Sequence, residues 1–491
     1  MTLSGVEVLL ALAVVRLGAE PIKLHPDNPH YYLFKGRPTI LVTSAEHYGA
    51  VVNKDFDYVA YLDALKSYGL NYTRIYPGFL FEPVDKFIKH NTLGPKPEGL
   101  ILPWARSQQP GYVLGGNRFD LDRWDPAYFR RLKDFIKQAA RRGVVVEICF
   151  FNAQYNDTWP ISPLFHPNNA QGVGQCDFKD AQTLNHPDLV RREDDYVREI
   201  TREVNSFDNV ILEICDEPFL TGTPISLAGP WLNHLVEVVK QTERALPNKH
   251  LIAQQVEGPL GGPCDLSAHP DVSIIVAQYV WEASAEQMGG MKALDFEYGH
   301  NKPIEFNETY YYPIWYKGDA VGASRVEAWE FIGGGGASFN HLNGQYTVEN
   351  PRGDTPDNAQ VLRALKNLMD FMRHLDFIKM RPDRSFIVSG VPTGAWCRGL
   401  SQPGKQYALY LHHSVRGKDG PASEPAVYVV SPGSYTENLV LDLLAGTYQA
   451  DWVDPASGSV VRTEKVTHGG GHRTFTTPNH PIDIALRIKR L

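Results

Sequence analysis

Two glutamates, Glu217 and Glu308, each follow an apolar run of the kind that forms a buried strand, VILEIC and PIEF. A solvated surface does not explain an acid in that position. Cleavage of a glycosidic bond needs two carboxyl groups across a pocket, because one must protonate the leaving oxygen while the other attacks the anomeric carbon. The residue types and positions therefore favour Glu217 and Glu308 as such a pair.

The elements that must position these acids are eight short β-rich runs that alternate with helical patterns. The runs begin near residues 39, 71, 144, 210, 250, 272, 303 and 337. Alternating strands and helices imply parallel pairing, and eight units over about 340 residues fit a (β/α)8 TIM barrel better than an open sheet. Glu217 and Glu308 would then end strands 4 and 7 on opposite sides of the barrel mouth. That placement suits the separation of roughly 5 Å found in retaining enzymes.

The sequence changes character after Arg381-Pro382. Short β-rich runs separated by Gly, Pro, Asn and Ser replace the longer helical patterns. Such hairpin texture predicts a small antiparallel β-sandwich. We therefore expect a leader at 1–24, a catalytic barrel at 25–380 and an accessory β-sandwich at 381–491.

Other polar and aromatic side chains at predicted strand ends are candidates for substrate contact. Each also has a plainer interpretation, as an ion pair, a core tyrosine, a rim histidine or a packing aromatic. The candidates are His47, Arg74, Asn152, Asp216, Tyr279, Trp281, Tyr310 and His341.

Three segments give the barrel a resemblance to the clan A retaining glycoside hydrolases. VILEICDEP resembles the strand-4 motif of that clan, an apolar run followed by Asn-Glu-Pro, and KPIEFNE resembles its strand-7 motif. NYTRIYP resembles the strand-2 segment that carries an arginine. The C-terminal segment YQADWVDPASGSVV is similar to the small β-domain, often labelled collagen-binding, of apiosidase-like, family-140-type barrels. The resemblance extends over about residues 25–491.

This resemblance implies a role for each matched residue. Glu217 would be the acid/base and Glu308 the nucleophile, while Arg74 would orient Glu308 and favour its ionised form. Tyr279 stands where clan members often place a residue that contacts the nucleophile. The sequence departs from the clan at Asp216, where an asparagine that binds the sugar 2-hydroxyl is usual. An aspartate there would raise the pKa of the neighbouring acid or bind a different hydroxyl pattern.

Glu305 is a rival for the nucleophile. It precedes Glu308 by three residues, and this odd separation would place the two side chains on opposite faces of the strand, with Glu305 deeper. On that alternation we prefer Glu308.

Composition and missing motifs exclude several other functions. The 48 Lys+Arg against 56 Asp+Glu give a net charge of −8, and no basic block suggests nucleic-acid binding. No CxxC, Cys/His spacing or HExxH indicates a metal, and no GxSxG indicates a serine hydrolase, so we expect no cofactor and no metal. A carbohydrate is the expected partner, and the oligomeric state stays open. The alternative is a catalytically inactive carbohydrate-binding or structural barrel.

The apolar run Val6–Val15 bears on location. It is too short to span a membrane and resembles the core of a signal peptide, although no Lys or Arg precedes it. We therefore expect a secreted or periplasmic protein, with a cytoplasmic location as the alternative. Of the five cysteines, Cys149 and Cys215 fit buried thiols, whereas Cys176 and Cys264 fall in loops and could pair.

Overall fold

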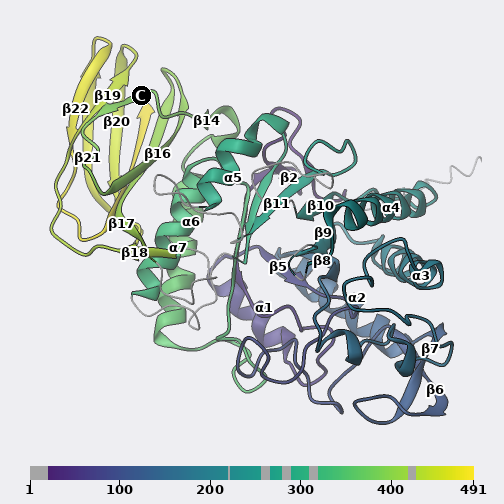
Figure 1. Cartoon of the computed structure of the whole chain (residues 1–491). Helices are drawn as coiled ribbons and strands as arrows, with labels where there is room; N and C mark the ends of the chain where they lie inside the picture. Colours follow the sequence, from purple (N-terminus) through teal and green to yellow (C-terminus); the bar gives the residue numbers. More distant parts are fainter. Residues whose placement is uncertain are drawn as a thin grey trace, which may run out of the picture.

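The computed structural model describes residues 20–218, 220, 222–255, 266–278, 289–308, 319–417 and 427–491. An eight-stranded parallel sheet forms a barrel surrounded by helices, and antiparallel sheets form a β-domain beside it (Figure 1). The predicted TIM barrel with a C-terminal antiparallel β-sandwich is confirmed.

The eight barrel strands coincide with the eight predicted runs. Strands buried on both faces form near-continuous apolar runs, which makes them a strong sequence signal. Their hydrogen-bonded order is β4-β13-β12-β11-β10-β9-β8-β5. The strands are β4 (Leu41–Ala45), β5 (Tyr72–Ile75), β8 (Val145–Asn152), β9 (Val210–Asp216), β10 (Ile252–Gln255), β11 (Ile274–Gln278), β12 (Ile304–Asn307) and β13 (Ser338–Leu342).

Asn71 joins β4 to β5, the two ends of this strand order. Its side-chain amide donates to the Ile40 carbonyl oxygen at 2.8 Å, and its side-chain oxygen accepts from the Val42 amide at 3.0 Å. The Asn71 backbone amide also donates to the Val42 carbonyl oxygen at 3.4 Å. The Asn71 side chain thus makes two of the hydrogen bonds that connect the β4 segment to the β5 segment.

Helices lie outside the barrel, and α2 shows the signals that delimit them. The Asp125 carboxylate caps its first turn, Pro126 occupies the first helical position, and Gly143 ends it in the left-handed conformation with φ 74°. The helices are α1 (Tyr58–Ser67), α2 (Pro126–Arg142), α3 (Pro187–Val204), α4 (Ile225–Arg244), α5 (Gly289–Glu297), α6 (Ala320–Gly333) and α7 (Pro356–Arg373), with 3-10 turns at Trp159–Ile161, His166–Asn168, Tyr298–His300 and Phe377–Lys379. None of the described helices is long and apolar enough to cross a membrane.

Two small sheets were not expected from the sequence. β1 (Lys23–Leu24), β2 (Tyr32–Phe34) and β3 (Arg37–Thr39) form an antiparallel sheet at the start of the barrel strands, where the buried Tyr32 hydroxyl lies 2.7 Å from the Ser338 hydroxyl. The long segment 77–125 contains a hairpin of β6 (Trp104–Pro110) and β7 (Asn117–Trp124).

The β-domain packs two antiparallel sheets around its own apolar core. Leu411, Trp452 and Leu486 of the larger sheet meet Leu439 and Phe475 of the smaller one. The larger sheet contains β14 (Arg381–Pro382), β16 (Ala395–Gln402), β17 (Gln406–Gly417), β18 (Val427–Val430), β20 (Gly446–Val453), β21 (Val460–His468) and β23 (Asp483–Arg490); the smaller contains β15 (Ile387–Ser389), β19 (Asn438–Leu443) and β22 (Gly471–Thr476).

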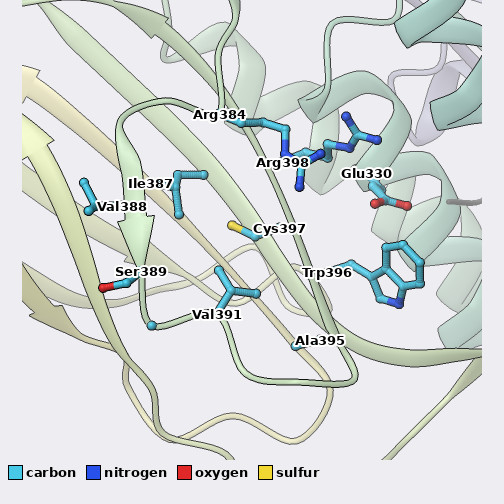
Figure 2. A pocket seen from close by; sticks show the side chains of 11 residues that line it. Glu330, Arg384, Ile387, Val388, Ser389, Val391, Ala395, Trp396, Cys397 and Arg398 are labelled. Atoms are coloured by element: carbon cyan, nitrogen blue, oxygen red, sulfur yellow. The ribbon is translucent and has the colours of Figure 1, made fainter. Parts of the chain in front are cut away.

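Helices α6 and α7 face the β-domain (Figure 1). Arg325 of α6 forms a buried, two-pronged ion pair with Asp483 of β23, with N···O distances of 2.9 and 3.0 Å. A cavity of about 650 Å³ also lies at this junction, between Glu330 of α6 and the strands β15 and β16. Figure 2 shows Arg398 on the side of the cavity nearer to Glu330.

Candidate active site

Arg74 is the centre of a buried cluster of charged side chains inside the barrel. It lies on β5, is fully buried, and contacts three carboxylates from other strands. Its Nε donates to Glu213 Oε2 at 2.8 Å, and its Nη1 donates to Glu308 Oε1 at 3.0 Å. Its Nη2 lies 3.0 Å from Asp216 Oδ1. One guanidinium cation is therefore shared by three carboxyl groups.

The two glutamates singled out from the sequence share an unusual backbone conformation. Glu217 and Glu308 each follow the last residue of a barrel strand, and each has φ 50°. A positive φ is unfavourable for a residue with a Cβ and persists only where its surroundings enforce it. The side-chain oxygen of Gln255 accepts from the Glu217 amide, and that of Asn307 accepts from the Glu308 amide at 2.8 Å. These bonds hold the backbone of both glutamates in a conformation in which side chains no longer alternate as they do along the strand.

Tyr155 holds the carboxyl group of Glu217. Its hydroxyl donates to Glu217 Oε2 at 2.7 Å. Tyr155 follows β8, so a phenol from one strand end meets a carboxyl group from the next. The contact fixes the orientation of a group that is only 6% exposed.

Asp216, which replaces the asparagine of the clan motif, is fully engaged by protein donors. Besides Arg74, its Oδ2 accepts from the Tyr76 hydroxyl and from the Asn152 amide at 2.9 Å, and its Oδ1 accepts from the Gln278 amide at 2.6 Å. Asp216 therefore competes with Glu308 for Arg74.

The cluster has more acids than one arginine can neutralise, and the pKa values follow from that. Burial raises the pKa of Glu308 well above its ordinary value; the charge of Asp216 raises it further, while Arg74 lowers it. Burial likewise raises the pKa of Glu213, against the effect of Arg74. Carboxyl groups this close and this buried cannot all be ionised together.

Below this cluster, Glu305 lies in the interior of the barrel. Its Oε1 accepts from the Tyr72 hydroxyl at 2.8 Å. Burial and the charge of Glu213 raise the pKa of Glu305 to about 8, and burial and the charge of Glu305 raise that of Glu147 well above its ordinary value. The two facing carboxyl groups thus retain a proton that an exposed glutamate would release.

The strand-face argument that separated Glu305 from Glu308 is wrong. Glu305 and Asn307 both point into the barrel, where Asn307 accepts from Asn340 at 2.8 Å and from Tyr48 at 3.2 Å. Glu308 reaches Arg74 because it lies beyond the strand with a left-handed backbone, so strict alternation no longer applies to it. The two acids differ in depth: Glu305 lies deeper in the barrel, against Tyr72, whereas Glu308 lies at the strand end, against Arg74.

The remaining candidates are placed differently. Asn152 joins the cluster through Asp216. The His47 Nε2 lies 3.7 Å from Glu82 Oε1, and burial lowers the pKa of His47 to about 3, so its ring is neutral. The structure does not bring His341 to the cluster, because Asn340 takes the inward position on β13 and the His341 ring packs against Phe339. Tyr279, Trp281 and Tyr310 lie outside the described residues, as does Val6–Val15.

Four contributors to the cluster were not selected from the sequence: Tyr76, Tyr155, Glu213 and Gln278. Tyr76, Tyr155 and Gln278 lie at or beyond strand ends, but nothing in the sequence distinguishes them from other polar residues there. Glu213 lies within an apolar run, where a buried acid is itself a signal that a cation must be near. Away from the site, Cys176 is a free thiol whose pKa burial raises to about 12, and Cys264 lies outside the described residues.

Comparison with known proteins gives structural relatives only. No family model matches the sequence, and no curated protein matches it. The chain is similar to an inferred glycoside hydrolase from Bacteroides vulgatus, with a TM-score of 0.64 and 15% identity over 96% of this chain and 83% of that one. It is also similar to a second glycoside hydrolase (TM-score 0.62, 12% identity, 96% and 97% covered) and to a family 5 glycoside hydrolase from Bacteroides vulgatus (TM-score 0.60, 12% identity, 96% and 93% covered). At these identities the likeness concerns the fold.

Proposed function

We propose that the protein is a retaining glycoside hydrolase that cleaves O-glycosidic bonds by double displacement. Glu308 attacks the anomeric carbon, and Glu217 protonates the leaving oxygen and then activates water for the second step. The structural relatives named above, which are described as glycoside hydrolases, support this class of activity. No cofactor enters the reaction.

The observation that carries the proposal is the pairing of the two glutamates at one end of the barrel. Both lie just beyond strand ends in a strained backbone conformation, and each is held by a different partner: Arg74 for Glu308 and Tyr155 for Glu217. Strain of this kind gathers at active sites. An arginine favours the ionised form that a nucleophile needs.

We further propose a relation to the apiosidase-like, family-140-type barrels with their small C-terminal β-domain, and a division of the chain near residue 380. Segments 77–125 and 153–186 would wall the site, which favours oligosaccharides or polysaccharide side chains as substrates. Asn152 and His47 are proposed substrate contacts, and so are Tyr279, Trp281 and Tyr310, which follow predicted strands. A location outside the cytoplasm fits the leader-like run at 6–15.

Hydrolysis of a panel of aryl glycosides and of plant and microbial oligosaccharides tests the proposal, with Glu308→Gln assayed alongside. Release by the natural protein but not by the variant supports a glycosidase with this nucleophile. Retention is tested by proton NMR of the anomer formed first. Saturable glycan binding without turnover on any substrate would instead favour the inactive carbohydrate-binding barrel.

A further inference from the structure

A second group of buried titratable side chains lies in the β-domain. His413 of β17, Glu437 just before β19 and His480 just before β23 are each less than a tenth exposed. One potential ligand atom from each lies within 4.8 Å of the others. The His413 Nε2 is 2.9 Å from Glu437 Oε1, and the His480 Nε2 is 3.6 Å from Glu437 Oε2.

The orientation of each side chain is fixed by neighbours outside the group. The His480 Nδ1 lies 3.0 Å from the Pro478 carbonyl oxygen, which places the hydrogen on Nδ1 and leaves Nε2 with a free lone pair. That Nε2 is buried and has no hydrogen-bond partner among the described residues. The Thr477 hydroxyl donates to Glu437 Oε2 at 3.0 Å, and the His413 ring stacks on Tyr435 at 3.5 Å.

Backbone hydrogen bonds hold the three contributing segments together. The His413 amide donates to the Ile482 carbonyl oxygen at 2.8 Å, and the Ser431 amide donates to the His413 carbonyl oxygen at 3.0 Å. Tyr435 and His480 exchange both of their backbone bonds, at 3.0 and 3.1 Å. The side chains therefore meet on a rigid frame and not on independent loops.

We propose that His413, Glu437 and His480 bind a divalent transition-metal ion of the zinc type. Two imidazoles and one carboxylate are a common zinc ligand set, and an imidazole whose other nitrogen is bonded to a carbonyl is the usual arrangement of a metal-binding histidine. Ligand atoms about 2.1 Å from a tetrahedral zinc are about 3.4 Å apart. The 2.9 and 3.6 Å distances reach different oxygens of Glu437. With one ligand atom from each residue all separations lie within 4.8 Å, so side-chain shifts would bring the three atoms to the spacing of a zinc site.

Such an ion would join strand β17 to the segments that lead into β19 and β23, which belong to the two different sheets of the β-domain. We assign the ion a structural role: it would tie these segments together, and binding to the folded chain alone would stabilise that chain. It needs no contact with the barrel site and does not depend on the proposed hydrolase activity.

The test uses the full chain, treated with a chelator and dialysed, and ZnSO4 as the probe. We expect one zinc per chain by elemental analysis after gel filtration, and a rise in Tm of about 5 °C or more. His480→Ala and Glu437→Gln should each lose both effects. His472→Ala, which changes an exposed histidine of the same domain, is the matched control and should keep both.

Less than a tenth of an equivalent of zinc bound to the natural protein would overturn the proposal. Zinc binding that is equal in His480→Ala and the natural protein would place the ion elsewhere and would overturn it too. If either variant fails to fold, the natural protein loaded with Co²⁺ decides: a tetrahedral visible spectrum that zinc displaces is expected. Its absence counts against the site.

Discussion

Two buried arginines show how differently this molecule uses charge. Arg325 meets a single carboxylate, Asp483, through two parallel hydrogen bonds, and the Tyr410 hydroxyl donates to Asp483 as well, at 2.7 Å. Arg74 is shared by Glu213, Asp216 and Glu308. The first arrangement pairs one cation with one carboxylate and is balanced in charge. The second has an excess of acid.

The difference indicates what each arrangement is for. A balanced pair at a junction fixes how two surfaces meet. An excess of buried acid lowers stability, and carboxyl groups with strongly raised pKa values gather at functional sites. This contrast supports function in the barrel cluster and architecture at the α6–β23 junction.

Two glutamates three residues apart, Glu308 and Glu305, give the largest expected difference in turnover. Glu308→Gln should lower turnover at least about 10⁴-fold, since it removes the proposed nucleophile and keeps the shape of the side chain. Glu305→Gln makes the same change three residues earlier, below the cluster, and should lower turnover less than about 10-fold. Steady-state kinetics on an aryl glycoside measures both. Equal losses in the two variants would contradict the assignment of Glu308.

Glu217 should show its role through the leaving group. Glu217→Ala should lower turnover about 10³-fold for oligosaccharides, whose leaving oxygen needs a proton, and much less for aryl glycosides with acidic phenols. A plot of rate against leaving-group pKa therefore steepens in the variant. Tyr155→Phe is the companion change, which removes the hydroxyl that holds Glu217. A uniform loss across all leaving groups in Glu217→Ala would argue against an acid/base role.

At the balanced pair, the expected effect is on stability. Arg325→Met leaves Asp483 buried without its cation and should cost about 3–5 kcal/mol of unfolding free energy. Adding Asp483→Leu to that variant should restore most of the loss, since an apolar pair of similar volume replaces a balanced ion pair at little cost. Urea denaturation followed by fluorescence measures both. If the double variant is no more stable than Arg325→Met, an apolar pair cannot replace the ion pair, and the expectation is wrong.

Asp216 is one of the three acids that share Arg74, and its charge raises the pKa of Glu308. Asp216→Asn removes a negative charge that raises the pKa of Glu308. The pKa of Glu308 should fall, so the acidic limb of the profile of kcat/KM against pH should move to lower pH. A limb that stays in place would show that Glu308 does not control it.

Much of the architecture was predictable, because barrel strands are continuous buried runs and their ends must gather on one face. This is why Glu217 and Glu308 could be selected before their surroundings were known. Other strands give weaker signals and are harder to predict: β21 carries alternating polar residues at an edge, β16 contains Gly399, and the hairpin β6–β7 lies among prolines and glycines.

The inner contacts of the cluster could not be predicted for a different reason. The donors to Asp216 come from β5, β8 and β11, which are far apart in the sequence. Only closure of the barrel brings them together. The left-handed backbone of Glu308 also breaks the two-residue period on which face assignments rely, so an argument from alternation misplaced Glu305 relative to its neighbour.

The smallest expected effect concerns the acids beneath the cluster. The pKa of Glu305 is about 8 in the folded chain and has an ordinary value of 4.5, so the folded protein holds a proton that the unfolded chain releases between those values. Stability should therefore fall as pH rises from about 4.5 to 8, since the native state binds more protons over that window. Replacing both Glu147 and Glu305 by Gln should flatten this slope of Tm against pH.

Asp63→Asn is the control, because Asp63 is half exposed and the pKa of its carboxyl is lowered by Arg142, so it titrates below this window. A slope unchanged in the double variant would place the retained proton on another group, and the excess of acid would then reside in the Arg74 cluster alone.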